Sequence, residues 1–233
     1  RDERSRNDQH AVRIISMENS GSLAFAVYGY MNCGAHEGEV GVGIYYFNID
    51  SSATEEKAFI PSTKSFAIAE DELGKMVYYN HSQEMLYVLA AGSLYQVDLE
   101  ADKQKVLADG LEEGQYAVSD DGHLMAYQTD GTLYTASEIK VMNLQNGDEF
   151  TIEAPEGQAV RPLGFVNSDF IYGKINPADA GVSASGEEIT PMYELEIRSA
   201  ENKVVTSYSF TDNNIYTTDI RVEDTLVTLN RVT

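Results

Sequence analysis

Residues 115–153 have the sequence QYAVSDDGHLMAYQTDGTLYTASEIKVMNLQNGDEFTIE. Four short apolar segments within it, 116–119, 124–128, 139–144 and 149–152, are separated by Ser-Asp-Asp-Gly, Thr-Asp-Gly and Gln-Asn-Gly-Asp. Asp-Gly and Asn-Gly between apolar runs mark tight turns, because glycine adopts positive φ freely and Asn and Asp tolerate it. The stretch therefore predicts a four-stranded antiparallel meander.

The same unit recurs along the chain. Counterparts of its second apolar segment begin at Ser22, Glu84, Asp169 and Thr225, and counterparts of its third begin at Ile44, Leu94 and Met192. The copies are spaced roughly 40 to 60 residues apart, and a single meander cannot bury both of its faces, so this repetition is typical of a β-propeller. The sequence therefore predicts an all-β fold of about four complete four-stranded blades and the first hairpin of a fifth.

The central repeat also carries a family resemblance. The segment SDDGHLMAY at 119–127, followed by IKVMNL at 139–144 and Asn146-Gly147, resembles the repeat S-P-D-G-x-x-I-A-F … I-Y-V-x-D-L-x-x-G of TolB-like and WD-repeat-like propellers. The propellers of prolyl-oligopeptidase-type peptidases have the same repeat. Asp120 stands where that repeat has Pro, and the chain has no Trp, so it lacks a Trp-Asp signature. The resemblance implies a ring of blades around a channel, and it does not imply one activity.

Composition agrees with an all-β domain that carries a strongly negative surface. The chain has 233 residues, of which 42% are hydrophobic, and its 15 Tyr and 8 Phe suit the core of a sheet protein. The formal net charge of -22 repels phosphate groups, so we expect neither nucleic acid nor an anionic membrane surface as a partner. Acidic residues placed in turns for solubility are the plainer explanation of this charge. No apolar run is long enough to cross a bilayer, so we expect no direct membrane insertion.

Three further segments bear on the domain organisation. Residues 1–10, RDERSRNDQH, have nothing to bury and predict a flexible lead-in to a single propeller-like domain at 11–233. The chain has no signal peptide at its start and stops within a blade at LNRVT, residues 229–233, which indicates a fragment of a longer propeller. The segment FAIAEDELG at 66–74 fits a short connecting helix, with a strand as the alternative.

The loop at 29–43, GYMNCGAHEGEVGVG, contains more glycines than a blade turn needs. Cys33 and His36 lie three residues apart beside Glu37 and Glu39, and these side chains are of the types that bind zinc. A zinc site needs further ligands, and no second such pair lies nearby, so we expect no metal and no cofactor. A glycine-padded structural loop is the favoured interpretation, and a ligand-binding or partner-binding loop is the alternative.

Three long loops, 31–39, 129–137 and 176–190, all join second to third strands in the predicted blades. Equivalent connections of a propeller emerge on the same side of the ring, so this loop face is the predicted binding surface. Its candidate residues are Tyr30, Asn32, Cys33, His36, Glu37, Glu39, Tyr134 and Asp179.

The sequence contains no nucleophile-base-acid set, P-loop, dinucleotide fingerprint or Ca²⁺-binding loop. We therefore expect a non-catalytic domain that binds a protein, peptide or glycan through the loop face. The TolB-like resemblance implies a secreted or surface-attached bacterial protein, and hence an extracytoplasmic location. One alternative is an accessory propeller that gates or positions substrate for a hydrolase domain outside this segment. Another is a carbohydrate binder that uses Tyr28, Tyr30 or Tyr134 as stacking platforms.

Overall fold

A computed structural model describes residues 10–62, 76–182, 186, 188–210, 215–223 and 225–232. The chain divides into two compact units, residues 1–110 and residues 111–233. Residues 1–9 of the predicted lead-in and the whole of segment 66–74 lie outside the described residues, and His10 is the first residue of a strand. No helix in the described part of the chain has the length and apolar character that a membrane crossing requires.

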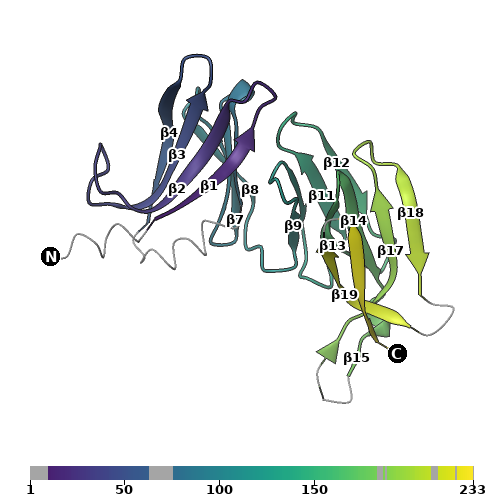
Figure 1. The fold of residues 1–233 in the computed structure, drawn as a ribbon. Helices are drawn as coiled ribbons and strands as arrows, with labels where there is room; N and C mark the ends of the chain where they lie inside the picture. Colours follow the sequence, from purple (N-terminus) through teal and green to yellow (C-terminus); the bar gives the residue numbers. More distant parts are fainter. Residues whose placement is uncertain are drawn as a thin grey trace. The chain divides into compact units, whose positions relative to one another are not determined.

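The first unit contains two four-stranded antiparallel sheets, in which every strand pairs with its neighbour in the sequence (Figure 1). Sheet 1 has the order β1-β2-β3-β4 and sheet 2 the order β5-β6-β7-β8. Their strands are β1 (His10–Met17), β2 (Leu23–Tyr30), β3 (Val40–Asn48), β4 (Ala53–Pro61), β5 (Met76–Asn80), β6 (Met85–Ala90), β7 (Ser93–Asp98) and β8 (Lys103–Ala108), and the 3-10 helix η1 (His81–Gln83) joins β5 to β6.

The second unit contains sheet 3, of order β9-β10-β11-β12, and sheet 4, in which β13, β14, β17 and β18 pair in succession. The hairpin β19-β20 joins sheet 4 through a single residue pair, Met192 with Thr217. These strands are β9 (Tyr116–Val118), β10 (Leu124–Gln128), β11 (Glu138–Asn143), β12 (Glu149–Glu153), β13 (Ala159–Val166), β14 (Asp169–Ile175), β17 (Met192–Arg198), β18 (Val204–Ser209), β19 (Tyr216–Glu223) and β20 (Leu226–Val232).

The predicted fold class is confirmed, because the structure is all-β and built of four-stranded antiparallel meander blades with one further hairpin. Sheet 3 is the meander predicted from residues 115–153, and its strands pair in the predicted order. The turns follow the local chemistry: Gly122 and Gly147 have φ of 75° and 81°, values that glycine adopts without a steric penalty.

The predicted loop at 176–190 contains more regular structure than its polar sequence indicates. The 3-10 helix η2 (Pro177–Asp179) begins it, and the Asn176 side chain caps this helix by accepting a hydrogen bond from the Ala178 backbone N–H at 3.1 Å. The short strands β15 (Gly181–Val182) and β16 (Glu188–Ile189) then pair as a hairpin.

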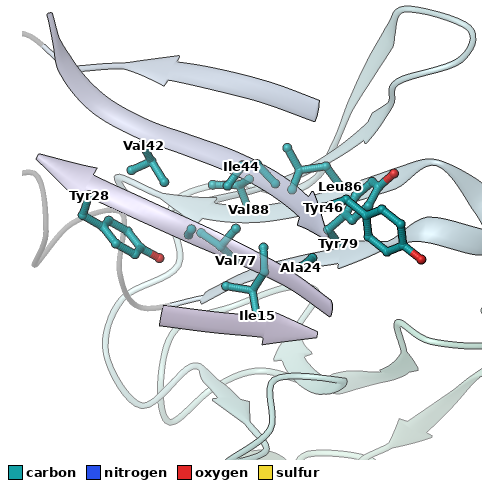
Figure 2. Packing of buried hydrophobic residues seen from close by; sticks show 11 residues of the cluster. Ile15, Ala24, Tyr28, Val42, Ile44, Tyr46, Val77, Tyr79, Leu86 and Val88 are labelled. Atoms are coloured by element: carbon teal, nitrogen blue, oxygen red, sulfur yellow. The ribbon is translucent and has the colours of Figure 1, made fainter. Parts of the chain in front are cut away.

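The core of the first unit lies between sheets 1 and 2. Alternate residues of β2 and β3 face sheet 2, as the two-residue period of a strand requires. Figure 2 shows these side chains meeting those of β5 and β6 in one layer. The buried cluster comprises Ile15, Ala24, Ala26, Tyr28, Val42, Ile44, Tyr46, Val77, Tyr79, Leu86 and Val88.

The core of the second unit lies between sheets 3 and 4, and its buried cluster comprises Leu124, Ala126, Ile139, Val141, Ile152, Val160, Phe165, Phe170 and Tyr172. A buried amide ties the two sheets together beside it. The Gln128 side-chain amide donates hydrogen bonds to the Val160 carbonyl at 2.8 Å and the Leu133 carbonyl at 3.1 Å, and its carbonyl accepts one from Gln115 at 3.0 Å. All the polar atoms of this buried side chain are thereby hydrogen-bonded, as burial requires.

Candidate functional site

A cleft of about 430 Å³ lies between sheets 3 and 4, within the second unit. Its apolar wall consists of side chains at the end of the core cluster: the buried Leu124, Phe165 and Phe170, and the half-buried Phe150. Its polar rim comes from the turn between β11 and β12, the turn between β13 and β14, and the turn between β17 and β18. The cleft therefore combines an aromatic floor with polar groups carried on short turns.

The aromatic floor follows from the pairing of β13 with β14. Phe165 and Phe170 are direct cross-strand partners, and their ring centroids lie 5.2 Å apart at an angle of 43°. A β-bulge between Pro162 and Gly164 shifts the register before Phe165. Such a bulge re-aims the side chains that follow it, and here it places Phe165 on the same face as Phe170.

Both turns at the acidic side of the rim are held by their own hydrogen bonds. The Asn143 side chain accepts hydrogen bonds from the backbone N–H groups of Gln145 and Asn146, at 2.9 and 3.2 Å. The Asn146 amide in turn donates to Asp148 at 2.8 Å. In the other turn, the Ser199 hydroxyl donates to Glu201 at 2.8 Å. Because these contacts fix the turns, a ligand meets a rim that is already ordered.

All three ionisable residues that line the cleft are acidic: Asp148, Glu149 and Glu201. Lys140 lies 2.7 Å from Glu149 and neutralises that carboxylate. Asp148 and Glu201 form no ion pair with any described residue. The hydrogen bond from Ser199 lowers the pKa of Glu201, so this carboxylate is charged at neutral pH.

A buried charge network supports the turn between β17 and β18 from within sheet 4. Glu196, whose side chain is 7% exposed, accepts hydrogen bonds from the Tyr172 hydroxyl at 2.7 Å, the Lys174 ammonium at 2.8 Å and Arg198 Nε at 2.6 Å. Arg198 then donates to the Asn202 side chain at 2.8 Å. Asn202 lines the cleft, so the network positions a rim residue through Arg198.

The network also sets the ionisation of its members. Burial alone would raise the pKa of Glu196, but the hydrogen bonds from Lys174, Tyr172 and Arg198 outweigh it and hold that pKa below its ordinary value. Burial lowers the pKa of Lys174, yet the hydrogen bonds to Glu194 and Glu196 raise it overall. Burial and the bond to Glu196 raise the pKa of Tyr172 to about 12. The carboxylate and its cationic partners are therefore all charged at neutral pH.

In the first unit, the predicted loop residues 31–39 fold back toward sheet 1. The Met31 N–H donates to the Glu39 carbonyl at 2.8 Å, and the His36 ring stacks on Phe59 with centroids 3.8 Å apart. The two ring nitrogens of His36 lie 3.3 Å from Glu39 and 2.9 Å from Glu56. The structure thus brings His36 together with Glu39, and both nitrogens of the imidazole contact carboxylates.

The other predicted residues of this loop differ in exposure. Cys33 is a free, exposed thiol, Asn32 and Glu37 are exposed, and Tyr30 is half-buried at the end of β2. Over the described ranges, no group of three or more His, Cys, Asp and Glu side chains is placed to hold a metal ion.

Two glycines assigned to the loop 29–43 belong instead to β3, where they allow close packing. A Cβ atom on Gly41 would lie 2.3 Å from the Ile60 carbonyl oxygen, and one on Gly43 would lie 2.6 Å from the Tyr45 ring. Sheet packing therefore accounts for both residues, which lie in a strand and not in the predicted loop.

Tyr134 and Asp179, the predicted site residues of the second unit, do not line the cleft. Tyr134 is 37% exposed and lies under the Arg161 guanidinium, whose central carbon is 5.9 Å from the ring centroid. Asp179 is half-buried in η2. Their loops join second to third strands, whereas the cleft is lined by turns at the opposite strand ends. The sequence predictions therefore missed the cleft residues.

The turn between β9 and β10 holds a Ser, an Asp and a His in contact. The Ser119 hydroxyl donates to Asp121 at 2.7 Å, and His123 Nδ1 lies 2.6 Å from the same carboxylate oxygen. An activated serine would donate to the imidazole instead. Ser119 also accepts a hydrogen bond from the Leu124 N–H at 3.0 Å, so the group serves to close the turn.

A second polar cluster, at one end of the first-unit core, is also built for packing. His81 stacks on Tyr46 with centroids 3.8 Å apart, and the Tyr79 hydroxyl donates to Glu84 at 2.6 Å. Burial and the Glu84 carboxylate raise the pKa of Tyr79 well above its ordinary value. Its hydroxyl therefore stays protonated and has no tendency to act as a base.

No protein-family model matches the chain, and no curated protein does. Among solved structures, the chain is similar to the tricorn protease at 13% identity and a TM-score of 0.35, over 79% of this chain and 18% of that one. It is similar to a chain of the mitotic checkpoint complex at 12% identity and a TM-score of 0.35, over 94% of this chain and 62% of that one. The chain thus spans less than two thirds of either protein, and the fold assignment rests on the sheets themselves.

Proposed function

We propose that this chain is a non-catalytic binding domain that holds a peptide segment of a partner protein in the cleft between sheets 3 and 4. The observation that carries the proposal is the cleft itself, which joins an aromatic floor to a hydrogen-bonded polar rim. Its volume of about 430 Å³ lies within the range typical of ligand sites. The extracytoplasmic location implied by the TolB-like resemblance remains a prediction.

A peptide suits the cleft better than a glycan because of the floor. Phe150, Phe165 and Phe170 present hydrocarbon rings without hydroxyl groups, which match apolar side chains. The rim supplies the side-chain amides of Asn146 and Asn202 and the carboxylates of Asp148 and Glu201. Their oxygen atoms can accept hydrogen bonds from the backbone N–H groups of an extended peptide. The non-catalytic part of the proposal is supported by the Ser119 hydroxyl, which donates to the Asp121 carboxylate and not to the His123 imidazole.

Filling the cleft is expected to abolish peptide binding. Ser168 is exposed and lines the cleft, so Ser168→Trp places an indole over the floor with little cost to folding. Peptides selected from a random displayed library on the unmodified protein should bind this variant at least tenfold more weakly in a titration followed by fluorescence anisotropy.

Ser51→Trp, at an exposed turn of the first unit, is the matched control and should bind like the unmodified protein. Equal binding by Ser168→Trp would place the peptide site elsewhere and reject the cleft. Selective retention of an oligosaccharide from a glycan panel would favour the carbohydrate alternative, and hydrolysis of chromogenic esters by the purified chain would contradict the non-catalytic assignment.

A further inference from the structure

We propose that the cleft selects a positively charged side chain, arginine or lysine, within an otherwise apolar peptide segment. This inference rests on the proposed function, because it names the class of ligand that the same cleft binds. It follows from charge complementarity: every ionisable lining residue is acidic, Lys140 forms an ion pair with Glu149, and Lys203 attracts Glu201 without forming an ion pair.

The two unpaired carboxylates come from different sheets. Asp148 lies in the turn between β11 and β12 of sheet 3, and Glu201 lies in the turn between β17 and β18 of sheet 4. A cation in the cleft is therefore attracted from both walls, whereas an acidic side chain is repelled by both. Internal hydrogen bonds from Asn146 and Ser199 orient the carboxylates, so a ligand does not have to order them.

The aromatic floor of the cleft also favours a positively charged side chain. Phe165 and Phe170 are buried and back the apolar wall of the cleft, and the half-buried Phe150 is the lining ring with surface left for a ligand. The face of an aromatic ring attracts a cation, and the methylene groups of arginine or lysine pack against the same hydrocarbon surface. One long basic side chain can thus satisfy floor and rim together, which a short neutral polar side chain cannot do.

The competing explanation is that these acids belong to the general negative surface of a chain with net charge -22. That explanation predicts that basic peptides are attracted by the total charge and that added salt weakens the attraction. Removing two carboxylates anywhere on the surface should then reduce binding equally. The proposed site instead predicts that only the cleft carboxylates matter. The two explanations therefore differ in how they respond to matched charge-removing substitutions.

The test uses three fluorescein-labelled nonapeptide pools of random apolar residues, which differ only in a central arginine, citrulline or glutamate. Citrulline keeps the shape of arginine and removes the charge. On the unmodified protein, anisotropy titrations should show at least tenfold weaker binding of the citrulline pool than of the arginine pool, and weaker binding still of the glutamate pool.

In the double variant Asp148→Asn with Glu201→Gln, the preference for arginine over citrulline should fall below about threefold. Glu37→Gln with Asp50→Asn removes two exposed acids of the first unit and changes net charge equally, so it should keep the full preference. Equal loss in both double variants would support the general-surface explanation and overturn the inference.

The outcomes also separate this inference from the proposed function. If all three pools bind alike and Ser168→Trp blocks them all, the cleft binds peptides without charge selection, and only the inference fails. If Ser168→Trp leaves the binding of every pool unchanged, the cleft is not the peptide site, and both fail.

Discussion

Replacing Glu196 with alanine is expected to lower the free energy of unfolding by about 3–5 kcal/mol, the range found when one partner is removed from a buried ion pair. The carboxylate is 7% exposed and accepts hydrogen bonds from Tyr172, Lys174 and Arg198. Without it, the Tyr172 hydroxyl and Arg198 Nε lose their acceptor in a partly dry site, while Arg198 Nη1 keeps its hydrogen bond to Asn202. Lys174 keeps Glu194 at 2.7 Å, which limits the loss. Urea denaturation followed by circular dichroism measures it, since the chain has no Trp.

Two further variants show whether the network causes that loss. Glu196→Gln keeps an acceptor oxygen in place of the carboxylate, so it should lie between the unmodified protein and Glu196→Ala. Glu201→Ala removes an exposed carboxylate from the next turn and should unfold like the unmodified protein. Unchanged stability of Glu196→Ala would mean that sheet 4 does not depend on this network.

The same network predicts the direction of a pH dependence. The pKa of Glu196 is lower in the folded state than in the unfolded chain, because its hydrogen bonds favour the charged form. Its contribution is therefore complete above the ordinary carboxyl pKa of about 4.3 and is lost as the pH falls through the folded-state value. Between pH 6 and pH 3 the unmodified protein should lose more stability than Glu196→Gln does. Parallel losses in urea titrations at several pH values would contradict this.

The meander was predictable because its information is local. Each strand of sheet 3 is separated from the next by a connection that contains an Asp-Gly or Asn-Gly dipeptide, so the turn signals and the short apolar runs lie next to each other in the sequence. Gly122 and Gly147 have the positive φ that this chemistry predicts. The hairpin of β15 and β16 escaped prediction because each strand has two residues, too few to show any period.

The cleft was not predictable because it arises where two sheets meet. The Gln-Asn-Gly-Asp turn of sheet 3 and the Ser-Ala-Glu-Asn turn of sheet 4 lie some fifty residues apart in sequence, and each alone is an ordinary polar turn. Glu196 was hidden for a similar reason. The alternation in MYELEIR, residues 192–198, indicates one polar face on β17, but only the pairing of Tyr172 with Glu196 shows that Glu196 on this face is buried.

Shortening Leu124 to alanine is expected to cost about 2–5 kcal/mol of unfolding free energy, the range for removing a buried leucine side chain from a core. Leu124 is 4% exposed and packs in the cluster between sheets 3 and 4. Part of its surface also lines the cleft, so partial collapse of the floor should place the loss in the lower half of that range. Equilibrium urea unfolding at neutral pH, with the slope compared between variants, measures the change.

The matched control for Leu124→Ala is Leu226→Ala, because Leu226 also lies on a strand but is 62% exposed. Its substitution should change stability by less than about 0.5 kcal/mol, as at most surface positions. Similar losses of unfolding free energy in the two variants would show that the Leu124 side chain does not pack in the core. Since a strand displaced by one residue turns every side chain to the other face, that result would reject the register of sheet 3 and the cleft built on it. A large loss in Leu124→Ala alone would support both.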